Sequence, residues 1–150
     1  MVIREYMDSD KEQLIELLRL NTPEYFSPSE EEDLKDYLDN HADNYYVVDI
    51  DGVIVGCGGF NLTDDRETGK ISWDIIHPKS QGQGVGRELT LFRIRKMKEI
   101  ESIKTISVRT SQLAYKFYAK FGLELREVVK DYWDKGFDMY RLDCDVNLIK

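Results

Sequence analysis

Cysteine and long apolar runs are scarce in this 150-residue chain, and each scarcity excludes a class of protein. The two cysteines, Cys57 and Cys144, cannot form a framework of several disulfides, and no metal-ligand spacing surrounds them. The longest apolar stretch, residues 53–60, contains three glycines and is far too short to cross a bilayer. The first residues do not lead into the apolar core of a signal peptide. We therefore expect a cytoplasmic protein that spans no membrane and holds no metal.

Basic residues are also scarce, because 21 lysines and arginines stand against 29 aspartates and glutamates, giving a net charge of −8. A nucleic-acid partner would demand a basic face, so none is expected. The charge is unevenly spread: residues 79–98 carry six basic side chains and one acid, a local charge of +5, and the remainder carries −13. This basic segment suits a polyanionic ligand, although beyond Arg87 a solvated basic helix face explains it equally well. The acidic remainder slightly favours a cationic substrate.

Three of the ten glycines alternate in one segment, Gln81-Gly82-Gln83-Gly84-Val85-Gly86-Arg87, between an apolar run and a helix-like stretch over residues 88–100. Alternate glycines leave the backbone N–H groups unshielded, and at a helix start these groups lack intrahelical partners and lie at the positive end of the dipole. Such a loop binds phosphate or pyrophosphate. The spacing matches neither a nucleotide P-loop nor the dinucleotide fingerprint. A glycine-rich turn without a ligand is the alternative interpretation.

A second segment, residues 111–123, has the apolar spacing of an amphipathic helix, with Ser111 as the predicted N-cap and Gly122 just past its end. Together the two segments resemble the signatures of the GNAT superfamily of N-acetyltransferases. The first signature, Gln-x-x-Gly-x-Gly, is matched at Gln81, Gly84 and Gly86. The second, Asn-x-x-Ala followed by Phe-Tyr-x-Lys-x-Gly-Phe, is matched at Ala114, Phe117, Tyr118, Lys120 and Gly122, with Ser111 and Leu123 replacing the first and last residues.

The resemblance implies an enzyme that transfers an acetyl group from acetyl-CoA, its co-substrate, to a primary amine of a small molecule or peptide. In this family the amine attacks the thioester directly within a ternary complex. The cofactor-binding residues that it implies run along the pantetheine arm and around the pyrophosphate: Ile75, Ile76, His77, Gln81, Gly82, Gln83, Gly84, Val85, Gly86, Arg87, Ser111 and Tyr118. Backbone groups rather than side chains supply most of these contacts.

The implied reaction needs a proton donor, a group that stabilises the oxyanion, and a base. Tyr118 is expected to protonate the departing thiolate, because a phenol is a proton donor at neutral pH; on spacing alone it reads as a core tyrosine. The backbone N–H near Ile76 is expected to stabilise the oxyanion. Asp74 is the candidate base, and strand alternation is expected to place it on the same face as Ser72. An exposed strand carboxylate without a role explains Asp74 equally well, and His77 is an alternative base.

The acceptor pocket of this family is lined by the loop between the first helices and by the last strand pair. These segments supply Tyr25, Phe26 and Trp133, and Trp73 is added from the neighbouring strand. Aromatic side chains could enclose a cation or an apolar group, and could equally be core residues. Two other functional classes stay open: a non-catalytic acyl-CoA-binding sensor, and a homodimer subunit whose glycine loop has lost its ligand.

Periodicity and turn residues predict a single domain over residues 1–150. Ser9 and Glu12 form a predicted capping box, a second helix is expected to start at Ser27 or Ser29, and Asp51-Gly52 is a strong hairpin signal. The predicted strands span residues 2–6, 45–50, 53–60, 70–77, 104–109, 124–130 and 137–142. This order implies an α/β (α+β) domain, GNAT-like, with a mixed, mostly antiparallel sheet of six to seven strands flanked by about four helices.

Overall fold

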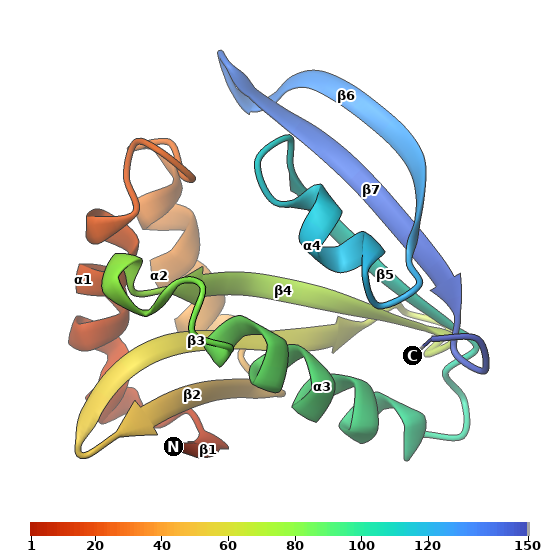
Figure 1. The fold of residues 1–150 in the computed structure, drawn as a ribbon, viewed down its shortest axis with the longest axis horizontal. Helices are drawn as coiled ribbons and strands as arrows, with labels where there is room; N and C mark the ends of the chain where they lie inside the picture. Colours follow the sequence, from red (N-terminus) through yellow and green to blue (C-terminus); the bar gives the residue numbers. More distant parts are fainter. Residues whose placement is uncertain (150) are drawn as a thin grey trace.

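Seven strands form one sheet in the order β1-β2-β3-β4-β5-β7-β6 in the computed structural model, which describes residues 1–149 (Figure 1). The strands are β1 (Val2–Glu5), β2 (Tyr45–Ile50), β3 (Val53–Leu62), β4 (Thr68–Ile76), β5 (Thr105–Ser111), β6 (Glu124–Asp134) and β7 (Phe137–Asp145). The helices are α1 (Lys11–Leu20), α2 (Glu30–Asn40), α3 (Val85–Lys98) and α4 (Tyr115–Ala119), with 3-10 turns η1 (Asp8–Asp10) and η2 (Pro78–Ser80). The predicted order of elements is confirmed, as is the mostly antiparallel sheet, in which only β4 and β5 pair in parallel.

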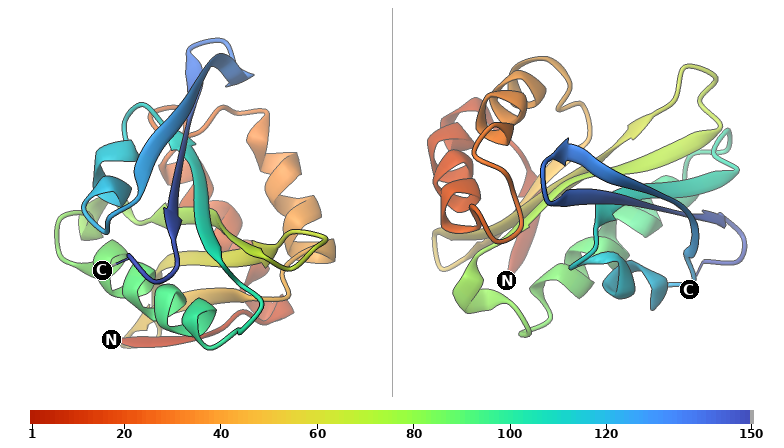
Figure 2. Two further views of the ribbon diagram at one scale, coloured as in Figure 1. Left: turned by 90° about the vertical axis from the view of Figure 1, so that its right-hand side faces the viewer. Right: turned by 90° about the horizontal axis from the view of Figure 1, so that it is seen from above.

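Helices cover both faces of the sheet, so the core lies in two layers (Figure 2). α1 and α2 pack on one face through Leu14, Leu17 and Leu18 of α1 and through Leu34, Tyr37 and Leu38 of α2, all of them buried. α3 and α4 pack on the other face, against buried residues of β3, β4, β5 and β7. Among residues 1–149, no helix is long and apolar enough to span a membrane.

The sheet opens in its middle, where β4 and β5 separate. The two strands pair only from Thr68 opposite Thr105 to Ile71 opposite Val108. Beyond this point β4 continues to Ile76 and β5 to Ser111, and Figure 1 shows the two strands diverging toward α1 and α2. Because parallel neighbours normally exchange hydrogen bonds along their whole length, the separated ends expose backbone groups inside the molecule.

A β-bulge in β4 turns one side chain to the other face of the sheet. Gly59 pairs with Ser72 and Cys57 with Ile75, so the two residues Trp73 and Asp74 lie opposite a single residue of β3. Trp73 has a φ of 50°, a conformation that non-glycine residues adopt rarely and that bulges stabilise. The expectation that Ser72 and Asp74 share a face is therefore wrong: Ser72 bonds Asn61 on the α2 side, and Asp74 lies against α3.

Two helix starts differ from the predictions. α1 begins after Asp10 rather than after Ser9; the Asp10 carboxylate accepts the Met7 N–H at 2.9 Å, which stabilises the preceding turn η1, and no side-chain hydrogen bond caps α1 itself. Ser111 ends β5 instead of capping α4, and its hydroxyl accepts the N–H of Leu113 at 3.2 Å. α4 is correspondingly short. The prediction for α2 is confirmed, since its N-cap is Ser29.

Replacing Asp10 with asparagine is expected to destabilise the fold by about 2 kcal/mol at pH 7, because hydrogen bonds to charged groups contribute about 1.5–3 kcal/mol. Asp10 is 3% exposed and accepts two hydrogen bonds from Arg4, at 2.9 and 3.0 Å. The hydrogen bond from Arg4 lowers the pKa of Asp10 most, and the bond from Met7 N–H also lowers it. The stabilisation is therefore present above the ordinary aspartate pKa, near 4, and is lost as the pH falls below it.

Urea unfolding of wild type and Asp10→Asn at several pH values measures this difference. The gap between the two proteins should shrink as the pH falls from 7 toward 3. The surface pair of Lys11 with Asp39, whose carboxylate is 54% exposed, provides the control: Asp39→Asn should cost no more than about 0.5 kcal/mol. A gap of the same size at pH 3 and pH 7 would show that the charge of Asp10 contributes nothing.

Candidate active site

The gap between β4 and β5 leads into a cavity of about 1350 Å³. Ligand pockets usually enclose roughly 300–1,000 Å³, so this cavity has room for a large cofactor and a second molecule together. Its walls come from the α1–α2 loop, β4, the glycine loop, the ends of β5 and β6, and α4. The predicted site residues that line it are Tyr25, Phe26, Trp73, Asp74, Ile75, Ile76, Gln81, Gly82, Gly84, Gly86, Arg87, Ser111, Tyr118 and Trp133. His77, Gln83 and Val85 do not line it.

The glycine loop presents open backbone donors at the start of α3. Gly84 is the N-cap and has a φ of 84°, a left-handed conformation that glycine adopts without strain. Within residues 1–149, the N–H groups of Gln81, Gly82 and residues 84–87 donate to no protein atom, whereas Glu88 N–H already bonds Gly84 C=O at 3.0 Å. Adjacent open donors at a helix N-terminus form an anion-binding site.

Asn21, which sequence reasoning missed, fixes this loop against β4. Its side chain is 3% exposed and donates to the Ile76 carbonyl at 3.0 Å and to the Leu17 carbonyl at 2.9 Å. Its own carbonyl accepts the Gln81 side-chain amide at 3.2 Å. The end of α1, the end of β4 and the glycine loop therefore meet at one amide. In the sequence, the only signal for this role was the position of an asparagine directly after an amphipathic helix.

Ile76 directs a backbone N–H into the gap. The next residue, His77, donates its N–H to Val55 of β3 at 2.8 Å. Because successive N–H groups of a strand point to opposite sides, the Ile76 N–H points away from β3 and toward the space that β5 has left. It lies beyond the last β4–β5 pair. His77 itself caps the start of η2, where its ring nitrogen Nδ1 accepts the Lys79 N–H at 3.1 Å.

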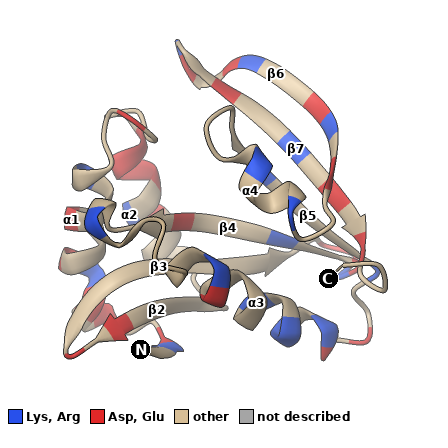
Figure 3. Cartoon of the chain, viewed as in Figure 1, with Lys and Arg blue, Asp and Glu red and all other residues tan. Residues whose placement is uncertain are grey.

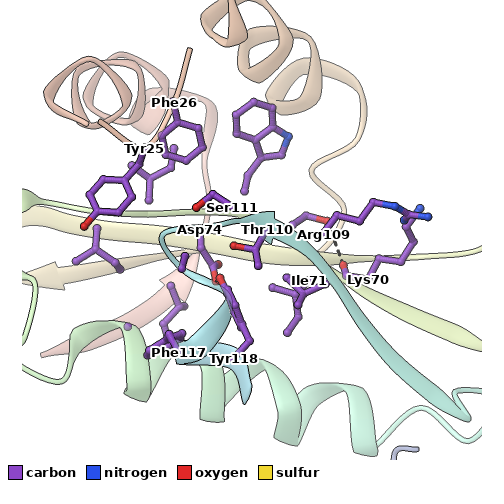
Figure 4. Close-up of a pocket in the computed structure, with 18 of the residues that line it drawn as sticks. Tyr25, Phe26, Lys70, Ile71, Asp74, Arg109, Thr110, Ser111, Phe117 and Tyr118 are labelled. Atoms are coloured by element: carbon purple, nitrogen blue, oxygen red, sulfur yellow. Dashed lines mark hydrogen bonds between the residues drawn. The ribbon is translucent and has the colours of Figure 1, made fainter. Parts of the chain in front are cut away.

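Tyr118, Asp74 and Arg93 form a buried polar cluster between the sheet and α3. The Tyr118 hydroxyl donates to Asp74 Oδ2 (Figure 4), and Arg93 forms an ion pair with the same carboxylate, with Nη2 at 2.9 Å from Oδ2. Arg93 is 0% exposed and also donates to the carbonyls of Gly59, at 3.1 Å, and Leu89, at 3.3 Å. A side chain at Gly58 would collide with Asp74, so glycine is required there.

Burial and charge determine the protonation states in this cluster. Burial raises the pKa of Tyr118 well above 10, and the Asp74 charge raises it further, so the phenol is neutral at physiological pH. Burial alone would lower the pKa of Arg93, but Asp74 more than offsets this and raises it above its ordinary value. The guanidinium therefore stays charged and holds the carboxylate in place.

For most basic residues beyond Arg87 the structure supports the alternative of a solvated helix face, and Arg93 is the exception because it is buried. Of the six basic residues in that segment, only Arg87 lines the cavity. The others on α3, apart from Arg93, are exposed at its far end (Figure 3): Arg95, Lys96 and Lys98. The helix extends about 20 Å, so these charges lie remote from the glycine loop. The spacing of Leu89, Arg93 and Met97 on one apolar stripe could have indicated that Arg93 faces inward.

Aromatic side chains enclose the other part of the cavity. Phe26 of the α1–α2 loop stacks on Trp73, with ring centroids 6.0 Å apart, and Tyr132 meets Trp133 edge-on near the tip of the β6–β7 hairpin. The two sides are joined where the Ser27 hydroxyl donates to Asp134 at 2.5 Å. All four predicted acceptor residues thus lie around one space.

Known proteins with similar sequences and folds fit this geometry. Over 96 residues, 61% of this chain, the sequence is 27% identical to an amino-acid acetyltransferase of Pseudomonas fluorescens, of which it covers 22%. The chain thus spans less than a third of the length of such curated relatives. An aminoglycoside 6′-N-acetyltransferase crystallised with coenzyme A has a TM-score of 0.78 at 18% identity, with 97% of both chains covered.

N-acetylglutamate synthase from Neisseria gonorrhoeae, in complex with coenzyme A and N-acetyl-glutamate, has a TM-score of 0.75 at 20% identity. The match covers 97% of this chain and 35% of that one. At such identities the structures establish the fold alone. The family model for the acetyltransferase (GNAT) family matches residues 11–123, three quarters of the sequence. On this match the chain belongs to the GNAT acetyltransferase family.

Proposed function

We propose that this protein is an acetyl-CoA-dependent N-acetyltransferase acting on a primary amine of a small molecule or peptide. The observation that carries the proposal is the position of the open N–H groups of the glycine loop, at the mouth of the β4–β5 gap that contains Tyr118. Acetyl-CoA supplies the activated thioester. From the glycine loop to Tyr118, the residues around the gap lie in the order needed to bind the diphosphate, the extended pantetheine arm and the thioester of acetyl-CoA. The comparisons with coenzyme A complexes support that assignment.

The loop and β4 hold the cofactor in this proposal. The N–H groups of Gly82 and residues 84–87 bind the pyrophosphate, and Arg87, exposed in the first turn of α3, adds a positive charge. The backbone of β4 near Ile76 pairs with the pantetheine arm in place of β5. Ser111, at the end of β5, faces the same space, with a hydroxyl where the family signature has asparagine.

The reacting groups follow from the orientation of the same elements. The amine nitrogen forms a bond to the thioester carbon, the Ile76 N–H stabilises the charge on the carbonyl oxygen, and the carbon–sulfur bond breaks. Tyr118 gives its proton to the departing sulfur. The resulting phenolate lies next to Asp74 and is a strong base, so it regains a proton quickly.

Asp74 is proposed as the acceptor of the amine's proton, directly or through water. Its contacts constrain that role, because one carboxylate oxygen is already shared by Tyr118 and Arg93. A proton received by Asp74 lies one hydrogen bond from the Tyr118 oxygen. The same carboxylate can therefore return a proton to the phenolate after each turnover.

Release of thiol from acetyl-CoA in the presence of a panel of amines tests the proposal. The panel should include amino acids, aminoglycosides, polyamines and peptides. Amine-dependent thiol release supports the enzyme, and its absence alongside tight CoA binding supports the non-catalytic sensor instead. The relatives' names include both amino acids and aminoglycosides as acceptors, so both classes belong in the panel.

Substituting Gly84 with aspartate should weaken CoA binding by at least 10-fold. The added carboxylate would repel the pyrophosphate and compete for the N–H groups of the helix start, where a hydrogen bond to a charged group contributes about 1.5–3 kcal/mol. A Cβ at position 84 meets no atom within 4 Å, so the change causes no collision, but the positive φ strains any residue other than glycine and the control must share that strain. Isothermal titration with CoA measures the effect.

The matched control is Gly52→Asp in the β2–β3 turn. Gly52 has nearly the same φ, 83°, and an equally open surrounding, and it lies remote from the cavity. The two variants therefore share backbone strain and charge and differ only in location. Equal CoA affinity for Gly84→Asp and Gly52→Asp would contradict the role of the loop.

A further inference from the structure

Two basic side chains, Lys70 of β4 and Arg109 of β5, lie next to one another where the two strands begin to separate (Figure 4). Lys70 pairs with Ser107, and Arg109 lies two residues further along β5 on the same face of the sheet. Ile71 and Val108, their neighbours in sequence, belong to the core layer on the α3 side. The two cations therefore face the opposite side, where the aromatic residues enclose the cavity.

Neither cation has an anionic partner within the part of the chain that the structure describes. No carboxylate oxygen lies within 4 Å of the Lys70 ammonium or the Arg109 guanidinium, although other lysines and arginines in residues 1–149 form such pairs. Arg141 of β7, directly opposite Arg109, shows the contrast, because it is paired with both Glu127 and Asp143. Partial burial lowers the pKa of Lys70, and the charge of Arg109 lowers it further. Two unpaired like charges side by side are unfavourable unless an anion joins them.

We propose that Lys70 and Arg109 form a binding subsite for an anionic group, a carboxylate or a phosphate, carried by the amine that is acetylated. This inference rests on the proposed function and specifies its substrate class. An amine that carries an anion would place that anion between the two side chains. Its nitrogen would then lie further along the gap, toward Ser111 and Tyr118. The distance from Arg109 to Ser111 along β5 is about 7 Å, which a small amino acid and a long basic side chain span together.

The phosphates of the cofactor do not account for this pair of cations. Open donors for a pyrophosphate lie in the glycine loop, beyond the carboxyl end of β4, whereas Lys70 lies near the start of that strand. Lys70 and Ile76 are six residue steps apart along an extended strand, roughly 20 Å. The net charge of −8 favours a cationic substrate. Next to Lys70 and Arg109, however, the local positive charge favours binding of an anionic group.

The test compares amines that differ only in the anion. Initial rates of thiol release give kcat/KM for L-alanine against L-alaninamide, 4-aminobutyrate against butylamine, and O-phosphoethanolamine against ethanolamine. We expect the anionic member of at least one pair to be preferred 10-fold or more. The first two pairs report a carboxylate at different distances from the nitrogen, and the third reports a phosphate. The pair with the largest ratio therefore identifies the anion and its spacing.

Variants then assign the preference to the two side chains. Arg109→Gln and Lys70→Gln should each lower kcat/KM for the anionic amine roughly 10- to 100-fold, with less than about 3-fold change for its neutral partner and for the KM of acetyl-CoA. Arg126→Gln, an exposed arginine on β6 outside the cavity, removes the same charge and should change neither. Circular dichroism and CoA affinity verify that each variant is folded.

The outcomes separate this inference from the function on which it rests. If wild type acetylates neutral or cationic amines as well as the anionic ones, or if the variants lower both members of a pair equally, the anionic subsite is overturned and the acetyltransferase stands. If wild type binds CoA but acetylates no amine, the proposed function fails and the subsite fails with it.

Discussion

Tyr118→Phe should lower kcat for acetyl transfer by about 100- to 10,000-fold, the range that a positioned proton donor contributes. The change removes one oxygen from a side chain that is 5% exposed, so packing is retained. Arg93 still pairs with Asp74 in the variant, so the buried carboxylate keeps a cationic partner. Affinity for CoA should stay within about 3-fold of wild type. Pre-steady-state thiol release, together with calorimetry, separates the chemical step from binding.

Tyr115→Phe is the matched control for this experiment. Tyr115 lies on the same short helix, stacks on Tyr140 and does not line the cavity. It should therefore keep kcat nearly unchanged. Because the pKa of Tyr118 is raised well above 10, wild-type kcat should show no loss through phenol ionisation between pH 7 and 10. Equal rates for Tyr118→Phe and wild type would show that Tyr118 has no catalytic role and serves only as a buried core residue.

Arg93→Met is expected to destabilise the fold by about 3–5 kcal/mol, the cost of leaving one partner of a buried ion pair uncompensated. Asp74 would lose its cationic partner, and the Gly59 carbonyl would lose its donor. The double variant Arg93→Met with Asp74→Asn should recover much of this loss, because it contains no stranded charge. Urea unfolding of the single and double variants measures both quantities.

Arg95→Met serves as the control, since Arg95 is exposed on the same helix and its loss should cost less than about 0.5 kcal/mol. If the single and double variants are equally unstable, the penalty comes from lost packing around Arg93 rather than from Asp74. Arg93→Lys, which keeps the charge but not the fork of donors, should fall between wild type and Arg93→Met.

Much of the fold could be predicted because its signals are local. The Asp51-Gly52 turn, the start of α2 and the glycine loop each occupy a few consecutive residues, and each was located correctly. The helix ends were less predictable where two residues compete to cap. Ser9 and Asp10 are both residue types that cap helices, but the Asp10 carboxylate bonds Arg4 and the Met7 N–H instead, and no side chain caps α1.

The polar cluster could not be predicted in full because it depends on pairings between distant segments. Asp74 faces α3 only because β4 bulges opposite a single glycine of β3, and strict alternation places it on the other face. The charge of the buried Arg93 is compensated by the Asp74 carboxylate, and Asp74 lies 19 residues away in the sequence. The resemblance to a known family pointed to Tyr118, and Asp74 was considered because of its place in the strand before the glycine loop, but Arg93 was not predicted as a partner. The roles assigned to Tyr118, Asp74, the cofactor-binding residues and the acceptor residues stay predictions.

The brief parallel pairing of β4 with β5 has a mechanical consequence. In the sheet, four residue pairs join strands β1 to β4 with the unit made of β5, β7 and β6. Apart from these pairs, the two halves are held together by the buried side chains that they share with α3 and α4. A molecule that hydrogen-bonds to both separated strands would add a further connection between the halves, so occupancy of the site and stability of the whole domain should rise together.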